Sequence, residues 1–276
     1  MTTIAIIGRD AADSPNMVAN DAAILECVAG ELQASGAMVI RPGGGTLPTD
    51  VDVVCHMSRT QATLQMLAKA EERGVIVINT PSAVNSCSRL RVMQALTDAG
   101  ITQPEYQEIT TLDELDRLPY PAWIKRSEGW SNHKEDVCFA SNCSEARDIF
   151  SSMMKRGIES CVHCRHIEGD IIKFYAVGEE CIHYCYPDPK KSKFGHEHIN
   201  GKPHHYPFDV EMMKSSITSA AKATGIEIYG GDCIVDKKGD IYIIDLNDFP
   251  SFTAVRHEAA RKIARYIIKK KDERRR

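Results

Sequence analysis

Short apolar runs alternate with helical patterns over the first hundred residues, and this alternation restricts the fold more than any other feature. The runs at 3–7, 37–40, 51–55 and 75–79 have the length and composition of buried strands. A helix is expected over 61–73, between the last two runs. Strands that alternate with helices predict a parallel sheet with helices on both faces.

The helix after the first strand is predicted to begin with Ser14 as its N-cap and Pro15 as its first residue. The preceding loop lacks a G-x-G-x-x-G pattern, so it does not support a dinucleotide-binding fold of the usual kind. Glycines 43–45 precede no helix, and we interpret them as a turn rather than a phosphate cradle.

A domain boundary is predicted after a helix that runs from Ser86 to Gly100, because the chain before Pro104 must be extended. Beyond it, an antiparallel strand pair, a helix and a run of further strands are expected. A helix over 209–224, a hairpin that turns at 237–240 and a closing helix from Thr253 follow the polar stretch 188–206. The tail after Lys269 is predicted to fray. The expected domains are 1–103, 104–166 and 167–276.

Charge and hydropathy exclude several classes of function. The net charge of −4 argues against a general nucleic-acid binder, which needs excess Lys and Arg to displace counterions. No apolar stretch approaches the roughly 20 residues that cross a bilayer, and the start has no signal-peptide pattern. We expect a cytoplasmic protein with reduced cysteines and without a membrane or nucleic-acid partner. The sequence is also compatible with a homodimer.

The strongest local pattern lies near the C-terminus, in GGDCIVDKKGDIYIIDLNDFPSF. On adjacent antiparallel strands, Asp232 can lie across from Asp245, and Asn247 shares a side with Asp245. Three oxygen ligands beside a nucleotide would suit Mg²⁺. The same spacing also fits an Asp that starts a hairpin and an Asn that caps a loop.

This segment resembles the metal-binding end of the ATP-grasp superfamily, where an acidic residue is followed by an acid, any residue, Asn and then Pro. Residues 53–104 resemble the end of the preceding domain in ligases of the RimK and LysX type. The resemblance implies a Rossmann-like parallel-sheet domain and two α+β subdomains that clamp ATP. It implies ATP and Mg²⁺ as cofactors, with Asp232, Asp245 and Asn247 as metal ligands.

The resemblance also implies nucleotide contacts in the middle of the chain. PAWIKRS resembles the strand whose lysine binds the ATP phosphates, which makes Lys125 the candidate. Arg89 stands where many members have a lysine, and the glycine-poor loop after Lys125 offers side chains such as His133. CRHIEGDIIKFYAVG resembles the linker strand whose backbone holds adenine, which implicates Arg165, His166 and Ile167, with Glu168 or Asp170 near the ribose.

The stretch 188–206 is basic in an otherwise acidic chain, which suggests that it binds an anionic acceptor or the ATP phosphates themselves. The acceptor is expected to be a small-molecule or carrier-bound anion. Lys173, Arg59 and Lys193 are the candidate catalytic residues around it. A solvated loop is the alternative interpretation of the basic stretch. The Cys and His residues of 161–185 are of the types that bind zinc. Strand alternation argues against a zinc site there, since Cys161 and Cys164 face opposite sides of a strand.

Two enzymatic reactions fit the same machinery. The first is a carboxylate-amine or carboxylate-thiol ligase, in which ATP converts a carboxylate to an acylphosphate that a nucleophile then attacks. The second is a small-molecule kinase, because IDLNDFPSF and IKFYAVG also resemble the inositol trisphosphate kinases. The ligase-like N-terminal half favours ligation. A nucleotide-binding sensor without turnover is the third interpretation.

Overall fold

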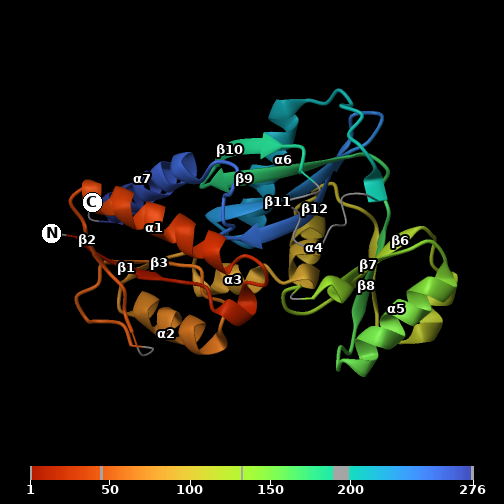
Figure 1. The fold of residues 1–276 in the computed structure, drawn as a ribbon, viewed down its shortest axis with the longest axis horizontal. Coiled ribbons are helices and arrows are strands. Elements are labelled where there is room, and N and C mark those ends of the chain that lie inside the picture. The colour runs from red at the N-terminus through yellow and green to blue at the C-terminus, as the bar shows by residue number, and fades with distance from the viewer. Residues whose placement is uncertain (1, 44–45, 132, 189–198, 275–276) are drawn as a thin grey trace.

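The computed structural model describes residues 2–43, 46–131, 133–188 and 199–274. Three four-stranded sheets and seven α-helices are found in these ranges. The molecule is elongated, with the N-terminal sheet at one end and the sheet of the middle segment at the other (Figure 1). Both chain ends lie beside the N-terminal sheet.

The N-terminal sheet is parallel, with strand order β2-β1-β3-β4. Ile4 and Ile6 pack towards α1, whereas Ala5 between them packs towards α2. Both faces are thus covered, and the predicted α/β arrangement is confirmed. The elements are β1 (Thr3–Ile7), α1 (Val18–Ala34), β2 (Met38–Ile40), β3 (Val53–His56), α2 (Gln61–Glu72) and β4 (Ile76–Ile78).

The predicted start of the first helix is wrong. The helix begins at Val18, and the short helix η1 (Ala11–Asp13) precedes it. Ser14 does not cap α1, because its hydroxyl donates to Asp21 Oδ2 at 2.7 Å. The single helix expected from Ser86 to Gly100 is also two helices in the structure, α3 (Pro81–Ser86) and α4 (Arg89–Asp98).

The middle segment forms an antiparallel sheet, in the order β5-β8-β6-β7, with α5 on one face. The predicted strand pair is β6 and β7. Sequence reasoning missed β5, a four-residue strand at the sheet edge. The elements are β5 (Tyr106–Ile109), η2 (Leu112–Arg117), β6 (Ala122–Arg126), η3 (Lys134–Asp136), β7 (Val137–Ala140), α5 (Cys143–Lys155) and β8 (Cys161–Arg165).

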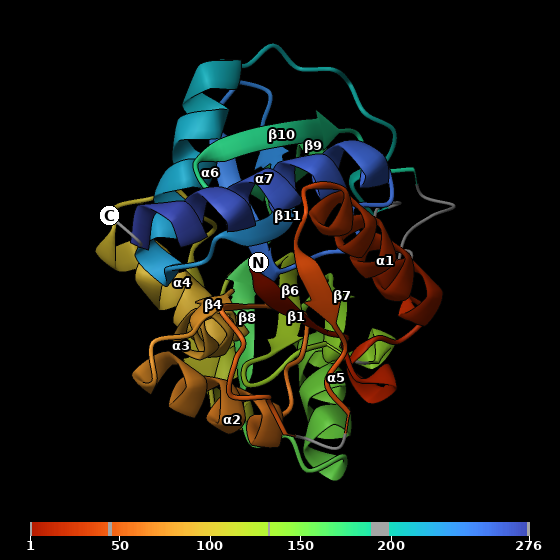
Figure 2. The same cartoon turned by 90° about the vertical axis from the view of Figure 1, so that its left-hand side faces the viewer.

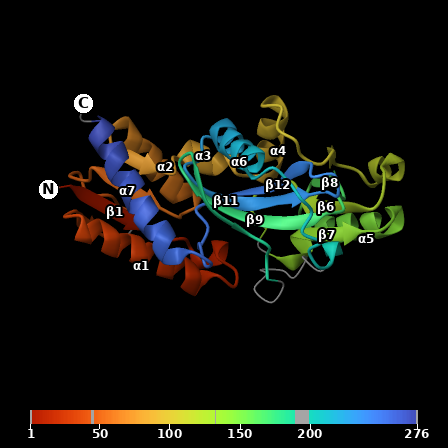
Figure 3. The same ribbon diagram turned by 90° about the horizontal axis from the view of Figure 1, so that it is seen from above.

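The last sheet lies between the other two parts, in the order β10-β9-β11-β12, and α6 covers one of its faces (Figure 3). All its strand pairs are antiparallel, and the predicted hairpin is β11 and β12. The elements are β9 (Asp170–Val177), β10 (Glu180–Cys185), α6 (Val210–Thr224), β11 (Ile228–Val235) and β12 (Ile241–Asp248).

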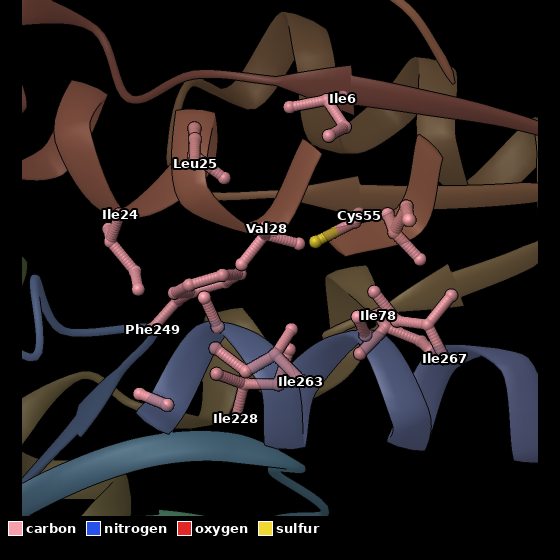
Figure 4. Packing of buried hydrophobic residues seen from close by; sticks show 14 of the residues in the cluster. Ile6, Ile24, Leu25, Val28, Cys55, Ile78, Ile228, Phe249, Ile263 and Ile267 are labelled. Carbon is pink, nitrogen blue, oxygen red and sulfur yellow. The ribbon is translucent and has the colours of Figure 1, made fainter. Parts of the chain in front are cut away.

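The closing helix α7 (Arg256–Arg274) packs beside α1 (Figure 2). Ile263 and Ile267 on α7, Val28 on α1 and Phe249 after β12 belong to one buried cluster (Figure 4). This core joins the first sheet to one end of the last sheet. The helix continues to Arg274, so the expectation that it frays after Lys269 is wrong, because Lys271 is largely covered.

Candidate functional site

A row of charged side chains crosses the last sheet on the face opposite α6. Lys173 on β9 pairs with Asp232 on β11, which pairs in turn with Asp245 on β12. Residues that pair directly share one face of a sheet. Ile172 and Cys233, their neighbours along the strands, pack towards α6 on the other face. Three strands therefore bring these charges side by side.

A bulge in β12 precedes Asp245, and regular alternation beyond it adds Asn247 to this row. Asp245 pairs with Asp232, whereas Ile243 pairs with the following residue of β11, so Ile244 is left out of the register. Such bulges re-aim side chains and often adjoin functional sites. Asn247 lies two residues beyond Asp245 and therefore on the same side. The structure thus brings the three predicted metal ligands together.

Two direct contacts connect the row. Lys173 Nζ lies 2.8 Å from Asp232 Oδ1, and Asn247 Nδ2 donates to Asp245 Oδ2 at 2.6 Å. Burial disfavours the ammonium, but the charge and hydrogen bond of Asp232, with contributions from Tyr175 and Asp245, raise the pKa of Lys173 above its ordinary value. Lys173 is therefore a cation that neutralises one of the two carboxylates.

Lys125 approaches this group from the sheet of the middle segment. It lies on β6 next to Ile124, which packs towards α5, so Lys125 is on the opposite face. The residue is 7% exposed. Burial and the charge of Arg89 lower its pKa, while the charges of Asp245 and Asp232 act in the other direction. The predicted phosphate lysine is therefore within electrostatic range of the predicted metal ligands.

Arg89 connects α4 to the loop between β6 and β7. Its Nη2 donates to Ser131 Oγ at 2.9 Å, and its Nε donates to the carbonyl of Arg126 at 3.0 Å. His133 is exposed, and it forms a capping box with Asp136 at the start of η3. The structure therefore places Arg89 near Lys125, whereas His133 is engaged in its own loop.

The predicted adenine segment runs from the end of β8 to the start of β9. The ring of His166 accepts a hydrogen bond from Trp123 Nε1 at 3.1 Å, and burial lowers the pKa of His166. The carbonyl of Ile167 accepts from Asn200 Nδ2 at 3.1 Å. Arg165 forms an exposed ion pair with Glu105, and Glu168 is also exposed. His166 and Ile167 alone of these four are partly covered.

Asp170 has a different role from the expected ribose contact. It is 2% exposed, and its two carboxylate oxygens accept the backbone N–H groups of His204 at 2.6 Å and Tyr206 at 2.8 Å. Both oxygens are thus used to hold the segment before α6 against β9. The expected ribose contact of Asp170 is therefore wrong, because this carboxylate binds the protein's own backbone.

The guanidinium of Arg59 is likewise bound by the protein itself rather than exposed to an acceptor. The residue is 7% exposed, its Nε donates to Asp248 Oδ1 at 2.8 Å, and its Nη2 also contacts this oxygen. The ring of Trp130 lies 4.9 Å from the Arg59 guanidinium. Burial opposes the ionisation of Asp248, but Arg59 and Arg9 hold its pKa below the ordinary value. The expectation of Arg59 at the acceptor is therefore corrected.

Sequence reasoning missed Arg9 and Asp248, which meet beside Arg59. Arg9 Nη2 lies 3.4 Å from Asp248 Oδ2. Arg9 lies two residues after the end of β1, and Asp248 is the last residue of β12. Charged residues at strand ends were the available signal. Lys193, the third predicted catalytic residue, lies outside the described residues, and Lys202 of the same basic stretch is exposed.

The cysteines of the middle segment do not gather around one point. Cys161 packs towards α5, while Cys164 packs with Met93 on the other face of β8, as strand alternation predicts. All ten cysteines are free thiols. In the described part of the chain, no three His, Cys, Asp or Glu side chains are close enough together to hold a metal. A metal at Asp232 and Asp245 therefore needs an amide oxygen and outside ligands.

A cavity of about 200 Å³ lies elsewhere, between β4 and α7. Its lining includes Glu71, Glu227, Lys270 and Arg274 but none of the predicted site residues. Lys270 pairs with Glu227, so the charges of the cavity partly satisfy one another. The charged row and not this cavity is the candidate functional site.

Solved structures show which fold this chain has, although no family model and no curated protein sequence matches it. A RimK domain ATP-grasp protein from Sphaerobacter thermophilus aligns with TM-score 0.71 and 14% identity, over 97% of this chain and 100% of the other. D-alanine–D-alanine ligase from Bacillus anthracis complexed with ATP aligns with TM-score 0.74 and 15% identity, over 100% and 99%.

A third structure, the ATP-grasp ligase PsnB complexed with minimal precursor, Mg and ADP, aligns with TM-score 0.67 and 15% identity, over 98% of each chain. The chain therefore has the ATP-grasp fold, and the predicted resemblance is confirmed at the level of the fold. Among the residues that the structure describes, no helix is both long and apolar enough to cross a membrane.

Proposed function

We propose that this protein is an ATP- and Mg²⁺-dependent ligase that activates a carboxylate as an acylphosphate. The observation that carries the proposal is the row formed by Lys173, Asp232 and Asp245, with Asn247 beside it and Lys125 on the neighbouring sheet. Two of the solved structures with the same fold are described as ligases, one complexed with ATP and the other with Mg and ADP. This supports ligation over the other reactions of the fold.

The donor set fits a hard cation. Mg²⁺ takes oxygen ligands, commonly one or two carboxylates completed by phosphates and water. Asp232 and Asp245 supply the carboxylates, and Asn247 supplies an amide oxygen. The amide nitrogen of Asn247 already donates to Asp245, which orients the side chain within the group. When bound, Mg²⁺ would neutralise charge on the terminal phosphates of ATP.

The chain's own cations complete the site. Lys125 and Arg89 are placed to bind phosphate oxygens, where buried positive charge stabilises the transferring phosphoryl group more strongly than in water. Lys173 lies on β9, between β10 and the strands that carry the metal ligands. Its positive charge would orient an anionic acceptor. His166 and Ile167 line the expected adenine side. Transfer of the γ-phosphoryl group to a carboxylate gives ADP and an acylphosphate, and attack by an amine or thiol then releases phosphate.

The test measures ATP turnover with metabolite extracts and identifies the products by mass spectrometry. We expect phosphate release that needs Mg²⁺, a carboxylate and a nucleophile together. Asp245→Ala and Asn247→Ala should lower turnover by at least about 100-fold, because each removes a metal ligand. Asp240→Ala is the matched control, since Asp240 is exposed in the turn of the same hairpin.

The outcomes separate the three interpretations. A stable phosphorylated hydroxyl compound without free phosphate would replace the ligase by a kinase. Tight ATP binding without turnover in any extract would instead indicate a sensor. Full turnover in Asp245→Ala would show that the charged row is not the catalytic centre.

A further inference from the structure

Four charged side chains are buried together where the N-terminal domain meets the end of β12. They are Arg9, Arg59, Asp21 and Asp248, each less than a tenth exposed in its side chain. Two positive and two negative charges balance one another, so the group is tolerated away from water. It lies immediately after Asn247, the last of the candidate metal ligands.

Arg9 holds the backbone at this point as well as the carboxylates. Its Nη2 donates to the carbonyl of Phe249 at 2.9 Å and to that of Asp248 at 3.2 Å. Its Nε donates to the carbonyl of Met57 at 3.2 Å, and its Nη1 lies 3.4 Å from Asp21 Oδ2. The chain leaves β12 through two consecutive carbonyls that one rigid guanidinium holds beside the carboxyl ends of β1 and β3, the central strands of the first sheet.

The segment held in this way has an unusual backbone. Phe249 has a φ of 29° and Phe252 a φ of 49°, in the left-handed region that bulky residues rarely adopt. Both side chains are fully buried. Ser251 between them donates to Asp21 Oδ1 at 2.5 Å, so the segment is tied down at a second point. Such conformations persist only where the surroundings hold them, and they concentrate at functional sites.

We propose that Arg9 is a positioning residue for the metal site. By holding Asp248 and Phe249, it sets the orientation of the Asn247 side chain. The inference rests on the proposed function, since it assigns Asn247 to a metal. The side-chain contacts of Arg9 are with Met57, Asp21, Asp248 and Phe249 and not with the candidate metal ligands. It sets the path of the backbone one residue beyond Asn247, and outer contacts of this kind commonly alter metal affinity about 10- to 100-fold.

The experiment measures Mn²⁺ binding in the presence of ADP by electron paramagnetic resonance, and thermal unfolding alongside. Arg9→Met removes every donor while keeping much of the side-chain volume. Arg9→Met with Asp21→Asn restores the charge balance of the buried group. Arg41→Met is the control, because Arg41 forms an exposed ion pair with Glu26.

We expect the dissociation constant for Mn²⁺ to rise at least about 10-fold in both Arg9 variants and to be unchanged in Arg41→Met. Arg9→Lys should recover part of the affinity, because an ammonium keeps one donor near the carbonyls. The dissociation constant for ADP in EDTA should be the same in all variants, because none of the side-chain contacts of Arg9 is with an expected nucleotide contact.

Two results have different meanings. A lower melting temperature with unchanged Mn²⁺ affinity in the charge-balanced double variant would show that Arg9 is merely structural and would overturn the inference. Absence of Mn²⁺ and ADP binding in the unaltered protein would instead overturn the proposed function.

Discussion

Replacing Gly231 by alanine gives the most direct test of the geometry of the site. Gly231 lies on β11 next to Asp232, and a Cβ there would stand 2.1 Å from the carbonyl oxygen of Asp245 and 2.6 Å from Phe174 Cζ. Real Cβ atoms essentially never come within 3.0 Å of another heavy atom. The Phe174 ring can rotate, but the Asp245 carbonyl is backbone. β11 and β12 must therefore separate by roughly 1 Å at Asp245.

Two effects of different size follow from this displacement. Overpacking of this kind costs about 1–3 kcal/mol, so a large share of the molecules stays folded at 25 °C. A misplacement of about 1 Å in a catalytic arrangement can lower the rate about 100-fold. We therefore expect Gly231→Ala to lose Mn²⁺ affinity and ATP turnover far more than it loses stability.

The assay combines urea unfolding with Mn²⁺ titration in the presence of ADP. Gly30→Ala is the matched control: Gly30 is exposed in the interior of α1, and a Cβ there meets no atom within 4 Å. It should stabilise the protein by about 0.5–1 kcal/mol and leave metal binding unchanged. Wild-type metal affinity in folded Gly231→Ala would refute the placement of β12 against β11 or the role of Asp245.

Two further predictions concern single buried groups. Burial lowers the pKa of His56 below 6.5, so the folded protein binds fewer protons than the unfolded chain below that pH, and its stability falls as the pH drops through about 6.5. His56→Gln should reduce this dependence by up to about 1.4 kcal/mol per pH unit in urea unfolding between pH 7.5 and 5.5, and identical slopes would contradict the assignment. Asp170→Asn should cost about 1–3 kcal/mol, because one of the two N–H groups it binds loses its acceptor. ADP affinity should not change, and a clear loss would restore Asp170 as a ribose contact.

Hydrophobic periodicity was enough to predict the layered first domain and the hairpin of β11 and β12. Alternation along these strands also predicted that Asp245 and Asn247 share a face, and the bulge at Ile244 did not disturb this because it precedes both residues. Local patterns are therefore reliable where one face of a strand is buried and the other carries polar groups.

The errors share a physical cause, which is competition from distant parts of the chain. Ser14 has the sequence of an N-cap, yet Asp21 and Arg9 draw it into a buried network. The sequence positions of Asp170 and Arg59 predict contacts with bound ligands. In the structure, Asp170 instead binds backbone amides, and Arg59 binds Asp248. Arg9 and Asp248, for example, are separated by 239 residues, and no local pattern reveals such partners.

The shared core of α1 and α7 has a consequence for biosynthesis. Val28 is synthesised well over 200 residues before Ile263 and Ile267, which complete its surroundings. At about 5–20 residues per second, α1 waits on the order of 10–50 s for α7. During that interval the apolar side of α1 is uncovered, so this nascent chain should be a strong client of chaperones that bind at the exit tunnel.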